Sequence, residues 1–292
     1  MENHRLLLII TGVVAFLFVT SITYSFMNGY DSYDDHSGLG AAISVSPDDT
    51  TILFSYYENG REAIYRGSLT NGEVVKMTEP ADQDHRMPQF SPDSNGILYL
   101  AADNDGVQSL HYINDPTGAE SIELTGADVH VSDAAFSPDG RTIYYIAIPA
   151  EDFLKPEGEK ENGADLFSVT AEDGDVLKLT DKDSFAMDGL IVSADGTTLY
   201  YTEFDGMQRL MAYSIEEGTE SAYLQEHLKN DLYQPAFSSD NELLSYTAVS
   251  EESSTGGSTF EYELFLIETS SGATKRLTDL NASVTSPAFF HH

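Results

Sequence analysis

The stretch Ala135-Phe136-Ser137-Pro138-Asp139, followed by Ile143-Tyr144-Tyr145-Ile146, decides the fold because it is one of five copies of the same pattern. Each copy has a short apolar run, a Ser-x-Asp turn and a hydrophobic strand. A repeat of this length predicts small sheets arranged around an axis. The turn serines, spaced 45, 46, 56 and 45 residues apart, are Ser46, Ser91, Ser137, Ser193 and Ser238.

Each copy also predicts two further strands. In the third strand apolar and other residues alternate, as in Leu166-Phe167-Ser168-Val169. A glycine turn then leads to a short fourth strand that closes with a pair such as Leu179-Thr180. Short aromatic and β-branched strands between turn signals are typical of sheets. A four-stranded sheet cannot bury both of its faces alone, so each sheet must cover the next, as in a β-propeller. We expect Tyr145 and Tyr201 to be equivalent core positions in neighbouring blades.

The pattern Pro-x-Phe-Ser-Pro-Asp, then a hydrophobic strand, a glycine turn and Leu-Thr, resembles the TolB-type repeat of six-bladed bacterial propellers. The resemblance covers residues 40–292 and implies an all-β propeller of four-stranded blades, with five complete repeats plus the first strand of a sixth (residues 283–290). The propeller is expected over residues 41–292, incomplete at its C-terminus. Such propellers host binding modules, lyases and peptidase gates, so the resemblance does not specify a function.

Residues 6–26, LLLIITGVVAFLFVTSITYSF, carry no charged side chain. A helix of this length spans roughly 30 Å, the thickness of a bilayer core. Arg5 precedes the segment and Asp31 follows it, which favours a cytoplasmic N-terminus over residues 1–5. We predict an uncleaved transmembrane signal-anchor, a polar linker over residues 27–40, and a propeller on the extracytoplasmic side of the cell membrane. A cleaved signal and a buried helix remain alternatives.

The net charge of −35 restricts the partners of this protein, because 49 acidic residues oppose 14 basic ones. A nucleic-acid-binding protein needs a basic surface, so we expect no nucleic-acid partner. Cysteine is absent, which excludes disulfides, thiolate catalysis and cysteine zinc sites. We expect no cofactor.

Two long insertions, at residues 149–164 and 250–262, are predicted to rise from one face of the propeller. Insertions in repeat folds often collect on the binding face, although surface loops without a function would look the same. The loops between blades reach the same face. The possible partner-binding residues on this face are Phe153, Lys155, Glu157, Phe260, Tyr262, His85 and His130.

No catalytic, cofactor or metal site is predicted. His85, His130 and His227 lie at different distances from the first strand of the following repeat, so we interpret them as surface histidines rather than a metal site. Residues 103–106, Asp-Asn-Asp-Gly, predict a type I′ hairpin turn better than a calcium loop. The sequence contains no Gly-x-Ser-x-Gly, His-Glu-x-x-His or glycine-rich phosphate loop.

The leading hypothesis is a membrane-anchored, extracytoplasmic, non-catalytic propeller that binds another protein or a cell-wall or envelope component, and not an enzyme. A first alternative is the N-terminal propeller of a prolyl-oligopeptidase-like serine peptidase whose hydrolase domain is absent from this chain. A second is a metal-dependent carbohydrate lyase with histidines in the channel.

Overall fold

The computed structural model describes residues 38–115, 120–172, 174–228, 231–249 and 261–280, together with Val284, Pro287 and Phe289. The predicted anchor (residues 6–26) and most of the predicted linker lie outside these residues. Within the described ranges, no helix is long and apolar enough to cross a membrane.

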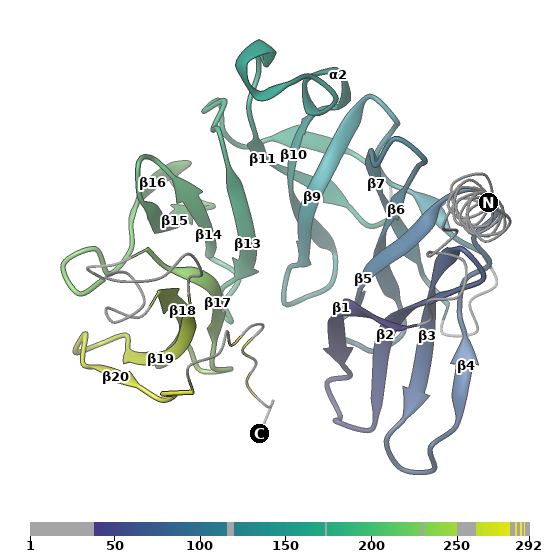
Figure 1. Cartoon of the computed structure of the whole chain (residues 1–292), viewed down its shortest axis with the longest axis horizontal. Coiled ribbons are helices and arrows are strands. Elements are labelled where there is room, and N and C mark those ends of the chain that lie inside the picture. The colour runs from purple at the N-terminus through teal and green to yellow at the C-terminus, as the bar shows by residue number, and fades with distance from the viewer. Residues whose placement is uncertain are drawn as a thin grey trace, which may run out of the picture.

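The described strands form five antiparallel sheets of four strands each, and every sheet follows the order of the chain. In Figure 1 the sheets surround a common axis, with the first strand of each sheet nearest the centre. The first sheet contains β1 (Gly38–Val45), β2 (Thr51–Glu58), β3 (Arg61–Ser68) and β4 (Val74–Lys76), and the second contains β5 (Asp84–Phe90), β6 (Ile97–Ala102), β7 (Gln108–Ile113) and β8 (Ile122–Glu123).

The other three sheets have the same design, with one insertion. After β10 the chain forms the short helix α2 (Ala150–Phe153) and the 3₁₀ turn η1 (Glu157–Glu159) before it enters β11. The strands are β9 (Val129–Phe136), β10 (Thr142–Pro149), β11 (Asp165–Thr170) and β12 (Val176–Lys178); β13 (Met187–Val192), β14 (Thr198–Phe204), β15 (Gln208–Ser214) and β16 (Thr219–Ala222); and β17 (Tyr233–Phe237), β18 (Leu243–Val249), β19 (Tyr262–Glu268) and β20 (Thr274–Arg276).

The Ser-x-Asp signature is explained by hydrogen bonds that recur in all five sheets. Each serine hydroxyl donates to the aspartate two residues later, at 2.6–2.7 Å. The serine Oγ also accepts a hydrogen bond from the backbone N–H of the residue five positions after the serine, at 2.7–3.0 Å. This bond holds the start of the second strand against the end of the first. The serine hydroxyl is the largest cause of a lowered pKa at Asp48, Asp93, Asp139, Asp195 and Asp240.

The threonine of the Leu-Thr pair has a related role. Its hydroxyl accepts the backbone N–H of the third strand at 2.9–3.0 Å, as Thr180 does from Leu166. The fourth strand ends before this pair, at Lys178 in the third sheet, so the predicted end of the fourth strand was too late. The threonine satisfies a main-chain donor at the point where the ladder stops.

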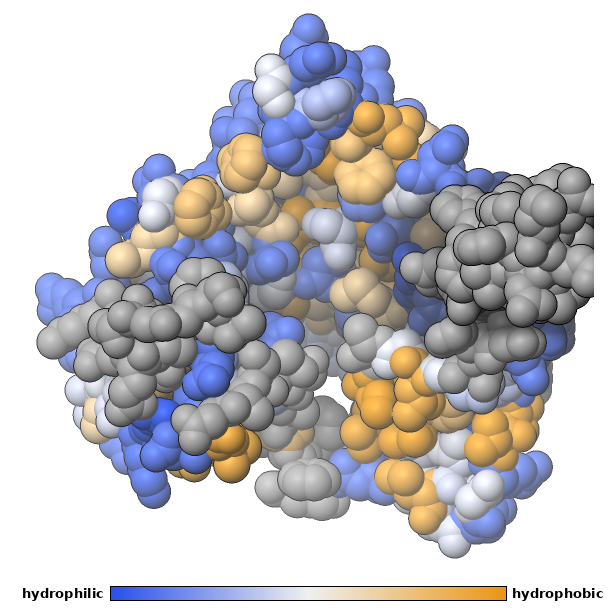
Figure 2. Space-filling view, viewed as in Figure 1, coloured by the Kyte–Doolittle hydropathy of each residue, from blue (hydrophilic) through white to orange (hydrophobic). Residues whose placement is uncertain are grey.

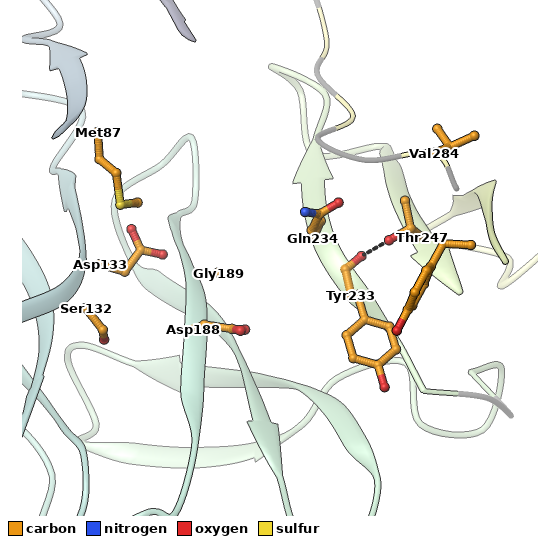
Figure 3. Close-up of a pocket in the computed structure, with 10 residues that line it drawn as sticks. Met87, Ser132, Asp133, Asp188, Gly189, Tyr233, Gln234, Thr247 and Val284 are labelled. Carbon is orange, nitrogen blue, oxygen red and sulfur yellow. Dashed lines mark hydrogen bonds between the residues drawn. The ribbon is translucent and has the colours of Figure 1, made fainter. Parts of the chain in front are cut away.

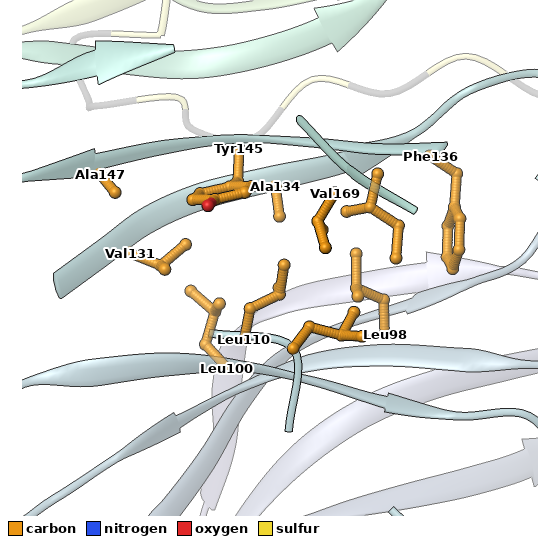
Figure 4. Packing of buried hydrophobic residues seen from close by; sticks show 11 residues of the cluster. Leu98, Leu100, Leu110, Val131, Ala134, Phe136, Tyr145, Ala147 and Val169 are labelled. Atoms are coloured by element: carbon orange, nitrogen blue, oxygen red, sulfur yellow. The ribbon is translucent and has the colours of Figure 1, made fainter. Parts of the chain in front are cut away.

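The hydrophobic core lies between successive sheets. In β6 all six residues are buried, because Ile97, Tyr99 and Ala101 face the first sheet while Leu98 and Leu100 face the third. Leu98 and Leu100 belong to one buried cluster with Tyr145 and Ala147 of β10, and Figure 4 shows the leucines on one side of this cluster and the β10 residues on the other. Burying one such leucine stabilises the fold by about 1.5–3 kcal/mol. Packing between sheets therefore stabilises the ring of blades.

Tyr145 and Tyr201 are both buried, at 3% and 0% exposure, as expected of equivalent core positions. Tyr145 packs between the second and third sheets, and Tyr201 packs between the third and fourth.

The predicted count of six blades is wrong for the described residues, which form five sheets. Of the residues expected to begin a sixth blade, Val284, Pro287 and Phe289 are described, and they belong to no strand. A first strand needs a second strand for its ladder of hydrogen bonds, and the described residues supply none. In Figure 1 the first and fifth sheets flank an opening. Figure 2 shows hydrophobic residues gathered on the first sheet beside it, whereas the outer rim is mainly hydrophilic.

Candidate functional site

The innermost strand of each sheet is interrupted near its middle. The register with the second strand shifts in all five sheets, for example between Arg86 and Gln89 and between Asp188 and Ile191. In three sheets a residue at the irregularity has a positive φ: Met87, Gly189 or Gln234, at 50°, 66° and 50°. Bulges of this kind redirect side chains and often lie beside functional sites.

Gly189 shows why one of these positions needs glycine. Its φ of +66° is rarely adopted by other residues, and an added Cβ would lie 3.3 Å from Cδ of Pro235 on β17. A larger residue would therefore be strained and would press against the fifth sheet.

A cavity of about 430 Å³ lies at these irregularities, a size typical of pockets for small ligands. Figure 3 shows Asp133 and Asp188 on one side of it and Tyr233 on the other. The cavity is lined by Met87, Ser132, Asp133, Asp188, Gly189, Tyr233, Gln234, Thr247, Tyr262 and Val284.

Asp133 links the third and fourth sheets. Its carboxylate accepts the backbone N–H of Ala134 and, across the sheet boundary, that of Leu190, both at 2.8 Å. The pKa of Asp133 is raised to about 6, with burial as the largest cause. The nearby charge of Asp188 also acts to raise it, while the backbone hydrogen bonds act in the opposite direction. Asp133 therefore gains or loses its proton near neutral pH.

Asp188 is held by side chains of its own sheet. Thr202 donates a short hydrogen bond to Oδ1, and the Gln208 amide lies 3.5 Å from the same oxygen. Thr202 and Gln208 are buried and bond to each other at 2.8 Å. One carboxylate oxygen is thus anchored in a polar network.

Two tyrosines form the facing wall. The rings of Tyr233 and Tyr262 meet edge to face, with centroids 5.3 Å apart and an interplanar angle of 89°. The Thr247 hydroxyl donates to the main-chain oxygen of Tyr233 at 3.2 Å, which ties β17 to β18 (Figure 3). The cavity thus combines carboxylates, aromatic faces and amide groups.

A second, mainly apolar cavity of about 730 Å³ adjoins the Ser-x-Asp ends of the inner strands. Phe90, Phe136, Val192 and Phe289 line it, and Met87 lines both cavities. The polar cavity, which contains the two carboxylates, and the apolar cavity therefore adjoin each other at Met87.

The structure places the predicted partner-binding residues in several different environments. Tyr262 lines the polar cavity, but the ring of His130 stacks on that of Phe153, with centroids 3.6 Å apart. This stacking packs the insertion after β10 against the start of β9. Lys155 forms an ion pair with buried Asp152, and Glu157 forms one with Lys160. Phe260 lies outside the described residues.

The interpretation of the three histidines as surface residues is wrong for His85 and His130, which are 8% and 5% exposed. His85 lies against Tyr99, with ring centroids 4.9 Å apart, and His130 accepts the backbone N–H of Gln108. Burial lowers the pKa of each histidine to about 4. His85 and His130 thus have different neighbours. The described part of the chain holds no group of three or more metal-ligating side chains.

The acidic hairpin at residues 103–106 is a turn that the Asp103 side chain closes. Its carboxylate accepts the backbone N–H groups of Asp105 and Val107, both at 2.9 Å. Only Gly106 in this turn has a positive φ, so the predicted type I′ conformation is wrong here. In the first sheet, Asn59 and Gly60 both have positive φ, as a type I′ turn requires.

Sequence reasoning missed Asp133, Asp188 and Tyr233. A signal was present, because these residues lie three or four positions before the last residue of the inner strand in each repeat. The same two positions of the repeat, three and four before the end of the inner strand, are occupied in the cavity by Met87, Ser132, Gly189 and Gln234. A bulge in the inner strand directs the side chains at these two positions toward the axis, and the repeat pattern does not reveal this bulge.

No family model matches this sequence. The chain is 27% identical over 225 residues to the uncharacterized peptidase YuxL of Bacillus subtilis, and 25% identical over 150 residues to dipeptidyl-peptidase 5 of Porphyromonas gingivalis. These matches cover 76% and 47% of this chain but only 29% and 20% of those proteins. The chain thus spans less than a third of the curated relatives it matches.

The expectation that this protein is not an enzyme is contradicted by these relatives. Two are named peptidases, and the fold also matches a puromycin-hydrolyzing peptidase of Mycobacterium tuberculosis, with a TM-score of 0.60, 14% identity, and coverage of 82% of this chain and 38% of that one. In such proteins a propeller belongs to an enzyme. The lack of a nucleophile motif in these 292 residues was therefore not a sufficient reason to expect a protein without enzymatic activity.

Other solved structures share the fold. TolB of Acinetobacter baumannii has a TM-score of 0.64 and 19% identity, over 85% of this chain and 56% of that one. An oligogalacturonate lyase in complex with manganese has a TM-score of 0.52 and 12% identity, over 80% and 75%. At these identities the likeness shows the fold alone. The chain folds as a TolB-like β-propeller, with five four-stranded blades in its described part.

Proposed function

We propose that this propeller is the substrate-binding part of a prolyl-oligopeptidase-like peptidase. The observation that carries the proposal is the 225-residue match to a named peptidase, which covers most of the described blades. The match spans 29% of that peptidase, which leaves most of its length for other functions.

The axial cavity supports a role in binding. Its walls come from four different sheets, so a ligand there would contact side chains that only the assembled ring brings together. Polar and aromatic side chains in one concave site are typical of ligand pockets.

Hydrolysis in this proposal requires residues beyond these 292. A serine peptidase of this class needs a nucleophile on a sharp turn, marked by Gly-x-Ser-x-Gly, and the 292 residues contain no such motif. The proposal therefore assigns binding and admission of the substrate to the propeller and bond cleavage to another segment.

The test is to read the gene past the codon for His292 and to treat its full product with a fluorophosphonate that labels active serines. We expect a downstream Gly-x-Ser-x-Gly and a labelled protein whose label is lost when that serine is changed to alanine. A stop codon within one blade length, or a full product that takes no label, would overturn the proposal.

We also propose that residues 6–26 anchor the protein in the cell membrane, with the propeller on the extracytoplasmic side near envelope or cell-wall components. The uncharged stretch and the acidic residues that follow it support this arrangement. Protease added to intact spheroplasts should digest the propeller of an outward-facing protein. Protection until the membrane is permeabilised would contradict that orientation.

A further inference from the structure

The polar axial cavity has a marked charge asymmetry. Asp133 and Asp188 are the two charged side chains among its described lining, and that lining includes no lysine, arginine or histidine. The whole chain carries a net charge of −35, so the surrounding field also favours cations.

The opposite wall is aromatic. Because Tyr233 and Tyr262 meet edge to face, with centroids 5.3 Å apart, the two rings are oriented in different directions at the cavity. Ring faces attract cations through their quadrupole, by about 0.5–1 kcal/mol at exposed sites and about 2 kcal/mol when the site is desolvated. Figure 3 places Tyr233 across the cavity from Asp188.

We propose that this cavity binds a cationic organic group, an ammonium or guanidinium, between the carboxylates of Asp133 and Asp188 and the rings of Tyr233 and Tyr262. The inference goes beyond the proposed function, because it concerns recognition by this chain alone and holds whether or not a hydrolase domain follows.

The carboxylates are positioned before any ligand arrives. Two backbone N–H groups, each at 2.8 Å, hold Asp133, while Thr202 and Gln208 hold Asp188. Binding to acceptors that are already fixed costs less conformational entropy than binding that must first order them. The two carboxylates also repel each other, since the charge of Asp188 favours the protonated form of Asp133. A bound cation would relieve that repulsion.

A metal ion fits this site less well than an organic cation. Divalent calcium takes six to eight oxygen ligands, often several carboxylates, whereas the described lining offers two carboxylates and otherwise only neutral oxygen atoms. The ring faces of the two tyrosines give a metal ion no ligand, but they give an ammonium or guanidinium group a favourable contact.

The test measures binding of trilysine to the full chain by titration calorimetry, in detergent and about 0.15 M salt so that distant surface charges are screened. The matched ligand is trilysine acetylated on its three side-chain amines and its amino terminus, which keeps the shape and removes the cations. We expect trilysine to bind and the acetylated peptide not to bind. Absence of trilysine binding, or equal affinities for both peptides, would overturn the proposal.

Variants then distinguish binding in the cavity from general attraction to the negative charge of the protein. Asp188→Asn should weaken trilysine binding about tenfold, and Tyr262→Leu about fivefold, by loss of a charge-assisted bond and of a cation–π contact. Asp105→Asn removes one exposed negative charge from a hairpin outside the cavity and should leave the affinity unchanged. Equal weakening by Asp188→Asn and Asp105→Asn would show that only net charge matters. Far-UV circular dichroism checks that each variant is folded.

Binding should also depend on pH. Because Asp133 titrates with a pKa of about 6, trilysine affinity should rise severalfold between pH 5 and pH 7 as its carboxyl becomes charged. Asp188 is the other acidic group at the cavity, and Tyr233 and Tyr262 are its remaining titratable side chains. Asp133→Asn should remove most of the rise, and an unchanged rise in that variant would contradict the role of Asp133.

Discussion

At the scale of single residues, the repeat signature consists of hydrogen-bonding groups. Ser137 donates to Asp139 at 2.7 Å and accepts the N–H of Thr142 at 3.0 Å, so one hydroxyl joins a turn to the next strand. The serine is 7% exposed, so its loss would leave a main-chain donor without a partner in a nearly buried position. The spacing of Ser and Asp in the sequence therefore reflects the geometry of one turn.

Ser137→Ala should lower the free energy of unfolding by about 1–2 kcal/mol, because the partly buried N–H of Thr142 loses its acceptor. Urea unfolding followed by circular dichroism measures this change. The control is Ser221→Ala, at an exposed position on β16, which should change stability by less than about 0.5 kcal/mol. If both variants lost the same stability, the hydroxyl of Ser137 would have no special role.

At the scale of elements, the insertion after β10 is held by one buried carboxylate. Asp152 accepts hydrogen bonds from Lys155 Nζ and the Glu161 N–H, both at 2.9 Å, and from the Asn162 amide at 2.6 Å. These bonds hold the pKa of Asp152 well below its usual range, with the Asn162 bond as the largest cause. The insertion is therefore an ordered part of the propeller face.

Asp152→Ala should release residues 154–164 without unfolding the blades, because the bonds it removes lie within the insertion. Limited trypsin digestion should then cut after Lys160 much faster than in the unmodified protein, whereas Pro156 protects the bond after Lys155. The control is Glu157→Ala, which removes one exposed ion-pair partner of Lys160 and should leave the cleavage rate nearly unchanged. Resistance of Asp152→Ala to trypsin would mean that packing of Phe153 on His130 is sufficient to order the segment.

At the scale of the whole molecule, stability comes from each sheet covering the next. Four buried clusters join the five sheets in sequence, and the one shown in Figure 4 lies between the second and third. Hydrogen bonds between inner strands add to this, for example from the Gln89 amide to the Ala134 carbonyl at 2.6 Å. Damage to one cluster should therefore affect the whole ring.

Tyr145→Lys and Tyr201→Lys should each abolish cooperative unfolding, because each removes a buried aromatic ring from a core cluster and places a charged side chain between two sheets. Thermal unfolding followed by near-ultraviolet circular dichroism is the measurement. Phe204→Lys, at the exposed end of β14, serves as the control and should keep a single transition. If both tyrosine variants unfolded like the unmodified protein, the alignment of the repeats would be wrong.

The sequence by itself determined the class of fold, the four-stranded repeat and the buried tyrosines, because turn hydrogen bonds and alternating strands are local. Only the tertiary structure decided the number of blades, the burial of His85 and His130, and the axial site of Asp133, Asp188 and the two tyrosines. These features depend on which sheets meet and on bulges that turn equivalent residues toward one axis. Such contacts join residues far apart in the chain, such as Asp133 and Leu190. The repeat marks the equivalent positions of these residues but does not show which of them come into contact.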